Sequence, residues 1–419
     1  MSVATARRAP AQRRSIASGV ILLLIGLSIF FLFGLGGDPE LTTKFGLNAS
    51  GSNAIKIPDL VLPSMMMIYL LSGIAVFLGA AHLMRGFKSV GWVMGVVAIC
   101  FVIAFLTWAA RGKSFNLVGM LSSSLVRATP IALAALTGVI SERSGVINIG
   151  IEGMMLMAAQ TSVIAASVTD SLWIGLLAAI FTGMLLAAVH AVLAIKFKVD
   201  QVVSGVAINI FATGLTSFIS SKFLERNGDL LNNSGTFPGV PIPLLSKIPI
   251  LGPIFFENNV IVYLMLLIVI TMHFVLFYTP WGLRTRAVGE HPKAADTLGI
   301  NVFLTRYVNV IIGGGIAGIG GAYFSIGSVG RFDEVMTAGK GFIGLAAMIF
   351  GKWNPIGSFL ASLLFGFADS LQIKLQILRV PIPSEFLLMA PYIVTMIVLA
   401  SVVGRAAAPA AEGVPYEKV

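Results

Sequence analysis

Long apolar runs recur along the whole chain and constrain its fold more than any other feature. A run of about 18 or more apolar residues is long enough to cross ~30 Å of hydrocarbon as a helix. The first run, 16–36, follows a leader that carries four arginines. It is longer than the apolar core of a signal peptide, and no small-residue cleavage site follows it. We therefore interpret it as a retained first span.

The composition agrees with a chain that folds in lipid. Of 419 residues, 57% are hydrophobic and 11% are charged, whereas about a quarter of the residues are charged in an average soluble domain. The net charge of +10 is interpreted as a signal for orientation in the membrane rather than for nucleic-acid binding. The single cysteine, Cys100, excludes a disulfide framework.

The hydropathy pattern predicts an all-α fold, a polytopic transmembrane helical bundle of about eleven spans, or ten to twelve depending on one interrupted segment. Helices are expected because the ~10-residue alternating strands of a barrel are missing from the pattern. The predicted spans are 16–36, 59–84, 90–110, 116–140, 147–168, 171–195, 201–221, 259–279, 303–328, a broken segment 341–373, and 385–403.

The distribution of lysine and arginine predicts the orientation. It favours both termini in the cytoplasm, with the polar stretches 37–58 and 222–258 outside. The predicted domains are a three-span N-terminal extension (1–114), a transmembrane core (115–404) with a cytoplasmic loop (280–301), and a cytoplasmic tail (405–419).

From about residue 115 onward, glycine, proline and polar residues interrupt the spans. Irregular backbone at membrane depth is tolerated where protein or a watery cavity satisfies its polar groups, and transporters build substrate paths in this way. We interpret the glycines of 313–321 as sites of close helix packing. The mixed polar and glycine segment 148–153 is interpreted as a functional break.

Glu152 and its neighbours are the first candidates for a substrate pathway. A carboxylate at membrane depth costs about 2.5–3.5 kcal/mol on insertion scales and should face protein or water. Glu152 is therefore either a polar part of the pathway, together with Asn148 and Gly153, or a structural carboxylate. In the second case it would pair with Arg143 or cap a broken helix.

Three more polar residues within apolar runs are candidates. Asn209 and Thr213 have the i, i+4 spacing of one helical face, which suits either a hydroxylated ligand or a hydrogen bond between helices. Arg127 could extend to the outer interface or line the pathway. His190, His273 and Asp369 are isolated in the sequence, and no spacing predicts a metal site or a catalytic constellation.

The loop 280–301 contains a short predicted helix at 292–298. Pro292 suits the first turn, Glu290 complements the positive helix end, and Gly299 suits the left-handed residue that closes a helix. So short a helix needs a partner to pack on. The loop is therefore either a rigid element that docks on another subunit or an ordinary basic loop. The residues predicted to couple the chain to that subunit are Arg284, Arg286, Gly289, Glu290, Pro292, Ala294, Ala295 and Gly299.

Four separated segments resemble those of one transporter group. Residues 286–302 (RAVGEHPKAADTLGINV) resemble the coupling loop of ATP-binding-cassette importer permeases in the branched-chain amino acid, ribose and nucleoside group. Residues 136–155 (LTGVISERSGVINIGIEGMM) and 205–214 (GVAINIFATG) look like the nucleoside-type branch. Residues 339–355 (GKGFIGLAAMIFGKWNP) resemble the late broken segment of the group. The resemblance covers about 115–400 and leaves the role of 1–114 open.

This resemblance implies a permease subunit in a bacterial inner membrane. Its expected partners are cytoplasmic ATP-binding subunits, a second permease chain in a heterodimer, an extracytoplasmic binding protein or lipoprotein, and membrane lipid, with no nucleic acid. No phosphate-binding G-x-x-x-x-G-K-[ST] loop occurs, so ATP is expected to bind to the partner, and this chain is expected to have no cofactor and no enzymatic activity. Nucleosides are the expected cargo, followed by simple sugars. The alternatives are branched-chain amino acids or a self-contained ion-coupled transporter.

Overall fold

The computed structural model describes residues 8–87, 89–383, 385–387, 389, 396 and 407–418. Within these residues, ten helices are long and apolar enough to cross a membrane, which confirms the predicted helical bundle. The predicted span 385–403 falls almost wholly outside the described residues. The ten helices are α2 (Arg8–Ser28), α3 (Ser64–Arg85), α4 (Val90–Ala109), α5 (Leu117–Glu142), α6 (Ile151–Thr169), α7 (Leu172–Ala191), α8 (Gln201–Ile219), α11 (Val260–Tyr278), α14 (Val302–Phe324) and α16 (Pro355–Ile377).

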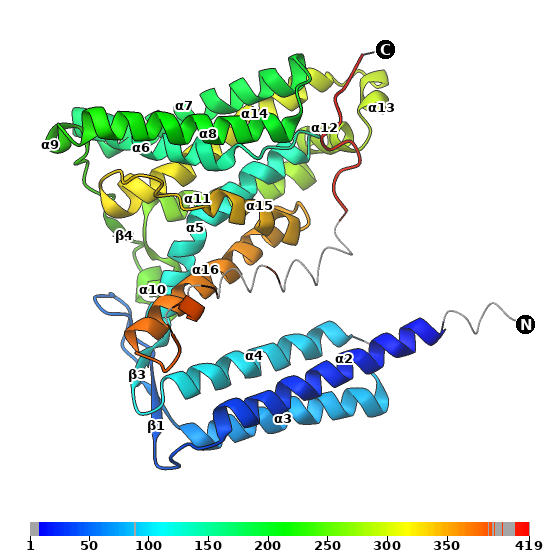
Figure 1. Cartoon of the computed structure of the whole chain (residues 1–419), viewed down its shortest axis with the longest axis vertical. Coiled ribbons are helices and arrows are strands. Elements are labelled where there is room, and N and C mark those ends of the chain that lie inside the picture. Colours follow the sequence, from blue (N-terminus) through cyan, green and yellow to red (C-terminus); the bar gives the residue numbers. More distant parts are fainter. Residues whose placement is uncertain are drawn as a thin grey trace, which may run out of the picture. The chain divides into compact units, whose positions relative to one another are not determined.

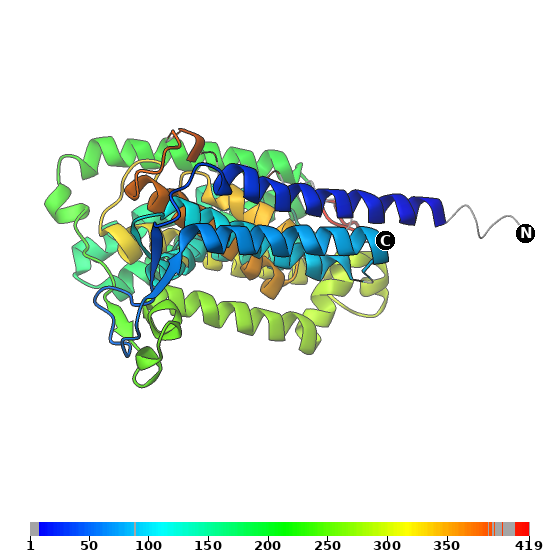
Figure 2. The same cartoon turned by 90° about the horizontal axis from the view of Figure 1, so that it is seen from below.

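The chain forms two compact units. The first comprises Met1–Gly119 and Lys374–Pro383, and the second comprises Met120–Ile373 and Ser384–Val419. In the first unit, α2 continues as a π-helix (Ile29–Gly34) and packs with α3 and α4 around an apolar core that includes Leu22, Ile68 and Val97. The three helices run side by side in Figure 1, and α2 and α3 are seen from below in Figure 2.

A small sheet, which the hydropathy pattern did not predict, follows the first span. Strand β1 (Thr42–Gly46) pairs antiparallel with β2 (Leu60–Pro63) and parallel with β3 (Ser114–Asn116). Strands of three to five residues give too few apolar/polar alternations to be recognised in a hydropathy pattern that is dominated by apolar runs of about twenty residues. The sheet joins the segments that enter and leave the three helices of the first unit.

The second unit is centred on α5 and α14, whose residues are mostly buried. Helices α7, α8 and α14 end in π-helical turns, Val192–Lys196, Ser220–Leu224 and Ser325–Val329. Helix α14 packs against α6 and α7, which is visible at the top of Figure 1. Between α8 and α11 lie three short helices and two strands: α9 (Gly228–Leu231), β4 (Gly239–Pro241), the 3₁₀-helix Leu245–Lys247, α10 (Leu251–Phe255) and β5 (Glu257–Asn259).

Glycines allow the close contact between α14 and α7. A Cβ atom at Gly314 would lie 2.4 Å from the carbonyl oxygen of Gly183, and one at Gly318 would lie 2.3 Å from that of Ala179. Real Cβ atoms do not approach backbone so closely, so only glycine fits at these two positions. The close-packing interpretation of the 313–321 glycines is confirmed for Gly314 and Gly318.

The broken segment predicted at 341–373 is two helices. Helix α15 (Lys340–Phe350) is too short to span a bilayer and is joined by a turn to α16. The loop predicted between α11 and α14 is more helical than expected. A helix, α12 (Pro280–Glu290), begins directly after α11 and precedes the predicted short helix, α13 (Pro292–Thr297). The Thr279 side chain caps α12, and Pro280 occupies its first turn.

Candidate transport pathway and coupling surface

The backbone is not helical between α5 and α6, and buried side chains satisfy it there. The Gln201 side-chain oxygen of α8 accepts a hydrogen bond from the Ile147 N–H at 2.7 Å. His190 of α7 lies with Nε2 2.8 Å from the Ile147 carbonyl oxygen. Protein groups thus replace the missing helical hydrogen bonds, as irregular backbone among membrane spans requires. The backbone is thus interrupted at 143–150, next to the predicted break, and a function for this break stays a prediction.

Asn209 also binds backbone groups near this break. Its Nδ2 donates to the Ile149 carbonyl at 3.0 Å, and its Oδ1 accepts from the Gly153 N–H at 2.8 Å. Thr213 is exposed and donates to the carbonyl oxygen of its own helix at Asn209. Asn148 is fully buried, and its Oδ1 has no hydrogen-bond partner. Asn209 thus makes hydrogen bonds between segments, one of the two alternatives considered for it, whereas Thr213 bonds within its own helix.

Glu152 caps the short helix α15. Its two carboxylate oxygens accept hydrogen bonds from the backbone N–H groups of Gly339 at 2.8 Å and Gly341 at 2.6 Å. The first N–H groups of a helix have no partner within the helix, and its N-terminus carries partial positive charge, so a carboxylate stabilises it. A Cβ atom at Gly341 would lie 2.7 Å from the Glu152 Oε2 atom. Glu152 therefore links the start of α6 to the start of α15. This agrees with the structural alternative considered for it, the capping of a broken helix.

Arg143 does not pair with Glu152. Its guanidinium donates to the carbonyl oxygens of Trp353 at 2.9 Å and Lys352 at 3.2 Å, in the turn after α15. The Trp353 indole in turn donates to the Glu142 carboxylate at 2.6 Å. The Arg143 side chain is half-buried, and this burial lowers its pKa. Both ends of α15 are thus held by residues at the junction of α5 and α6.

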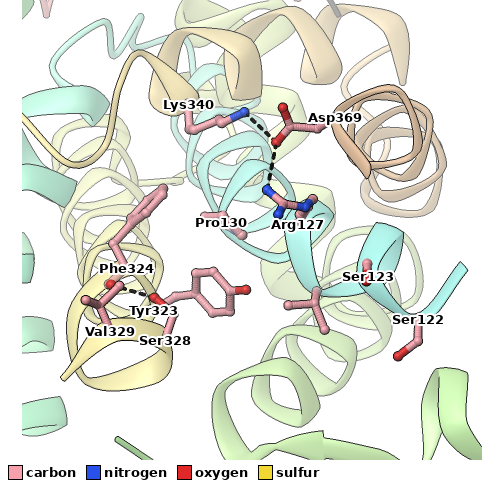
Figure 3. A pocket seen from close by; sticks show the side chains of 11 residues that line it. Ser122, Ser123, Arg127, Pro130, Tyr323, Phe324, Ser328, Val329, Lys340 and Asp369 are labelled. Atoms are coloured by element: carbon pink, nitrogen blue, oxygen red, sulfur yellow. Dashed lines mark hydrogen bonds and ion pairs between the residues drawn. The ribbon is translucent and has the colours of Figure 1, made fainter. Parts of the chain in front are cut away.

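A cavity of about 460 Å³ opens at the start of α15 (Figure 3). Asp369 of α16 lies between two cations, with its Oδ2 2.9 Å from the Lys340 Nζ and 3.6 Å from an Arg127 guanidinium nitrogen. Arg127 lies near the middle of α5 and lines this cavity. Aromatic residues Tyr323 and Phe324 of α14 line another side.

Sequence reasoning missed Asp369 and Lys340. Asp369 looked isolated because its partners, Arg127 and Lys340, lie in other helices. The available signal was the presence of opposite charges within separate spans, since intramembrane charges usually pair. Among the described residues, no group of three or more His, Cys, Asp or Glu side chains is arranged to hold a metal ion.

The predicted coupling residues divide into exposed and buried groups. Gly289 is buried, and a Cβ atom there would lie 2.2 Å from the Arg143 carbonyl oxygen. Ala295 is 2% exposed and belongs to an apolar cluster. These two residues therefore pack inside the chain and are not available for direct contact with a partner subunit. The residues left on the surface are Arg284, Glu290, Ala294 and Gly299, with Arg286 and Pro292 half-buried.

Details of the two short helices agree with the sequence prediction. Gly299 has a φ of +81°, the left-handed conformation expected after α13. The His291 ring nitrogen Nδ1 accepts from the Ala294 N–H at 3.2 Å and caps α13. The Arg286 guanidinium lies 5.1 Å from the centre of the Phe277 ring, so it is partly engaged within the chain.

Residues 120–406 match the family described as "Branched-chain amino acid transport system / permease component". The chain belongs to this permease family. The guanosine ABC transporter permease protein NupQ of Bacillus subtilis (strain 168) is 46% identical over 308 residues, which are 71% of this chain and 95% of NupQ. The nucleoside ABC transporter permease protein NupC of Lactococcus lactis subsp. cremoris (strain MG1363) is 42% identical over 310 residues, 71% of this chain and 96% of NupC. The putative glucose ABC transporter permease protein TsgC13 of Haloferax volcanii is 40% identical over 262 residues, 62% of this chain and 78% of TsgC13. No solved structure matches the chain.

Membership in the family sets the role of the chain. It is a multi-pass membrane permease of an ATP-binding-cassette transporter, and ATP hydrolysis belongs to a partner subunit. The permease works with ATPase and binding-protein subunits. The family match begins at residue 120, so most of the first compact unit lies outside it.

Proposed function

We propose that this permease forms the import pathway for nucleosides. NupQ and NupC, which match it over almost their whole length, are described as permeases for guanosine and nucleosides. The observation that carries the proposal is the capping of α15 by Glu152. In transporters, a half-helix N-terminus of this kind can bind the carboxylate of an amino acid. Here the protein's own carboxylate occupies it, which favours a cargo without an anionic group.

The cavity beside α15 is the proposed passage for the cargo. Its volume of about 460 Å³ falls in the usual range of small-molecule sites. The Asp369 carboxylate can accept hydrogen bonds from ribose hydroxyls or base N–H groups, and the rings of Tyr323 and Phe324 can contact the base. Gly153 and Asn209 support this passage through the backbone around Glu152. Asn148 and Thr213 are proposed to belong to the same pathway.

The complete importer is proposed to contain two cytoplasmic ATP-binding subunits, a second permease chain and an extracytoplasmic binding protein or lipoprotein. The termini and the α12–α13 pair then lie in the cytoplasm, and the segments 37–58 and 222–258 lie outside. The first unit, with its three spans, is proposed to be an extension attached to the transport core. The tail from 405 onward is proposed to be cytoplasmic.

Competition for uptake tests the substrate. In cells that express the full system, excess unlabelled adenosine should abolish uptake of radiolabelled guanosine, and excess leucine should leave it unchanged. Ribose should compete weakly if at all. Competition by leucine without competition by nucleosides or ribose would overturn the substrate assignment and leave the family assignment intact.

Neutralising Asp369 should impair transport. Asp369→Asn leaves two cations beside the cavity without their counter-ion and removes an acceptor for the cargo, so we expect guanosine uptake to fall about tenfold, the equivalent of roughly 1.4 kcal/mol. The matched control is Asp333→Asn, because Asp333 is exposed and pairs only with its near neighbour Arg331 among the described contacts. Uptake is normalised to the amount of assembled complex. Equal uptake by the two variants would show that the cavity is not part of the transport pathway.

A bulky residue on the exposed face of α13 should prevent coupling. Ala294 is exposed, so Ala294→Trp can keep the fold while it blocks the approach of an ATP-binding subunit. We expect the binding protein to stimulate ATP hydrolysis by the reconstituted complex at most weakly. Ala294→Ser, which changes the same exposed position without adding bulk, is the control and should be stimulated normally. Normal stimulation of the Ala294 variant would show that this face does not dock.

A further inference from the structure

The C-terminal segment 407–418, here called the strap, runs along the end of the second unit that carries α12 and α13 (Figure 1). It has no regular secondary structure, yet its backbone makes hydrogen bonds to three parts of this unit. The Ala411 N–H donates to the Gly289 carbonyl at 2.9 Å, and the Gly413 N–H donates to the Gly145 carbonyl at 3.2 Å. Arg306 of α14 donates to the Val414 carbonyl at 3.0 Å. The strap thus contacts α12, the turn after α5, and α14.

Tyr416 anchors the strap in an apolar cluster. The side chain is 5% exposed and packs with Val288 of α12, Ala295 of α13 and Val302 of α14. Its ring centre lies 5.3 Å from that of Phe303. One residue of the strap therefore fills the space between both short helices and the start of a spanning helix.

Polar contacts extend the attachment on both sides of Tyr416. Glu417 pairs with Lys198, which follows the end of α7. The Glu290 carboxylate accepts from the Ala410 N–H at 3.2 Å. Burial raises the pKa of the Glu412 carboxyl, which lies near Glu142 at the end of α5.

Helix α13 needs such support because it has only six residues. A helix of this length is unstable in isolation, and a force applied to it moves the spans only if it is fixed to them. Without the strap, the cluster around Ala295 loses Tyr416, and the link from Gly289 through Ala411 to Gly145 and α14 is broken. The strap therefore attaches α13 to the spans, as the transmission of a force from α13 to the spans requires.

We propose that the strap is a positioning element for coupling, which fixes the α12–α13 pair to α5 and α14 so that movement of the ATP-binding subunits reaches the spans. The inference rests on the proposed docking of those subunits on α13. Tyr416 and Arg306 are positioning residues in this account, since they act on the coupling helices and not on the cargo.

The test compares transport with ATP hydrolysis in the complete complex reconstituted in proteoliposomes. Two variants weaken the strap, Tyr416→Ala and deletion of 407–419. We expect both to assemble with the ATP-binding subunits and to hydrolyse ATP, with the number of cargo molecules imported per ATP lowered about fivefold or more, the usual range of a coupling effect. Tyr416→Phe keeps the ring and should restore the native ratio. Lys418→Ala, at an exposed position beside the anchor, is the control.

Three results would overturn the proposal. One is a native ratio of import to hydrolysis in both weakened variants. Another is loss of assembly in both, which would make the strap a folding element. The third is a parallel fall of import and hydrolysis at an unchanged ratio, which would place the strap in the docking interface itself. A wrong nucleoside assignment would be recognised separately, because the unmodified complex would then import another cargo. The ratio of import to hydrolysis would be measured with that cargo.

Discussion

Glu152→Ala should nearly abolish transport and lower the thermal stability of the purified chain. The substitution leaves the N–H groups of Gly339 and Gly341 without their carboxylate acceptor. A hydrogen bond to a charged group contributes about 1.5–3 kcal/mol, so the loss of two is a large fraction of the stability of a typical protein. The start of α15 would then detach from α6, and the cavity beside Lys340 would lose its shape. Guanosine uptake and the melting temperature in detergent are the two measurements.

Two further variants show whether the effect comes from the loss of this helix cap or from the loss of any negative charge. Glu152→Gln keeps one acceptor oxygen and should retain intermediate stability and uptake. Glu225→Ala removes an exposed carboxylate after α8 and should behave as the native chain does. Native uptake and stability in Glu152→Ala would contradict the role given to this carboxylate in holding the two broken segments together.

Gly314→Ala should strongly reduce the amount of folded protein. The added Cβ atom would lie 2.3 Å from the Ala187 Cβ and 2.4 Å from the Gly183 carbonyl oxygen, and neither atom can move without shifting a helix. Inserting one methyl group into a well-packed core costs about 1–3 kcal/mol, and a contact with backbone on a facing helix should fall at the upper end of that range. The yield of folded protein, measured by size-exclusion chromatography after membrane extraction, gives the size of the effect.

The neighbouring glycine supplies a matched control. A Cβ atom at Gly315 would lie 3.2 Å from the Met184 Cγ, a flexible side chain that can move aside. Gly315→Ala changes the same helix by the same methyl group and should cost much less. Equal yields of the two variants would contradict the close packing of α14 on α7.

The spans and both interruptions could be predicted from sequence because each leaves a local pattern. About twenty apolar residues indicate a span, and the polar residues within 148–153 indicate a break. The short helix at 292–298 was also predictable, since Pro292 and Gly299 mark its ends. Helix α12 was not predicted because its eleven residues include charged residues and two glycines, a composition typical of a loop.

The roles of individual polar residues were less predictable, because they depend on partners far away in the chain. Asn209 has the spacing of a ligand-binding face, yet both of its polar atoms hold the backbone before and within α6. Asp369 looked isolated, although Lys340 and Arg127 lie beside it. Tyr416 lies in a tail without hydropathy signal, and its burial against α12, α13 and α14 depends wholly on tertiary packing.

Import by the purified complex tests the central claim most directly. The permease, its second permease chain and the ATP-binding subunits are reconstituted in proteoliposomes with the binding protein, and accumulation of radiolabelled guanosine and leucine is followed with and without ATP. The account predicts that guanosine accumulates only with ATP and that leucine does not accumulate. Accumulation of leucine in place of guanosine, or accumulation of guanosine that needs an ion gradient and no ATP, would contradict it.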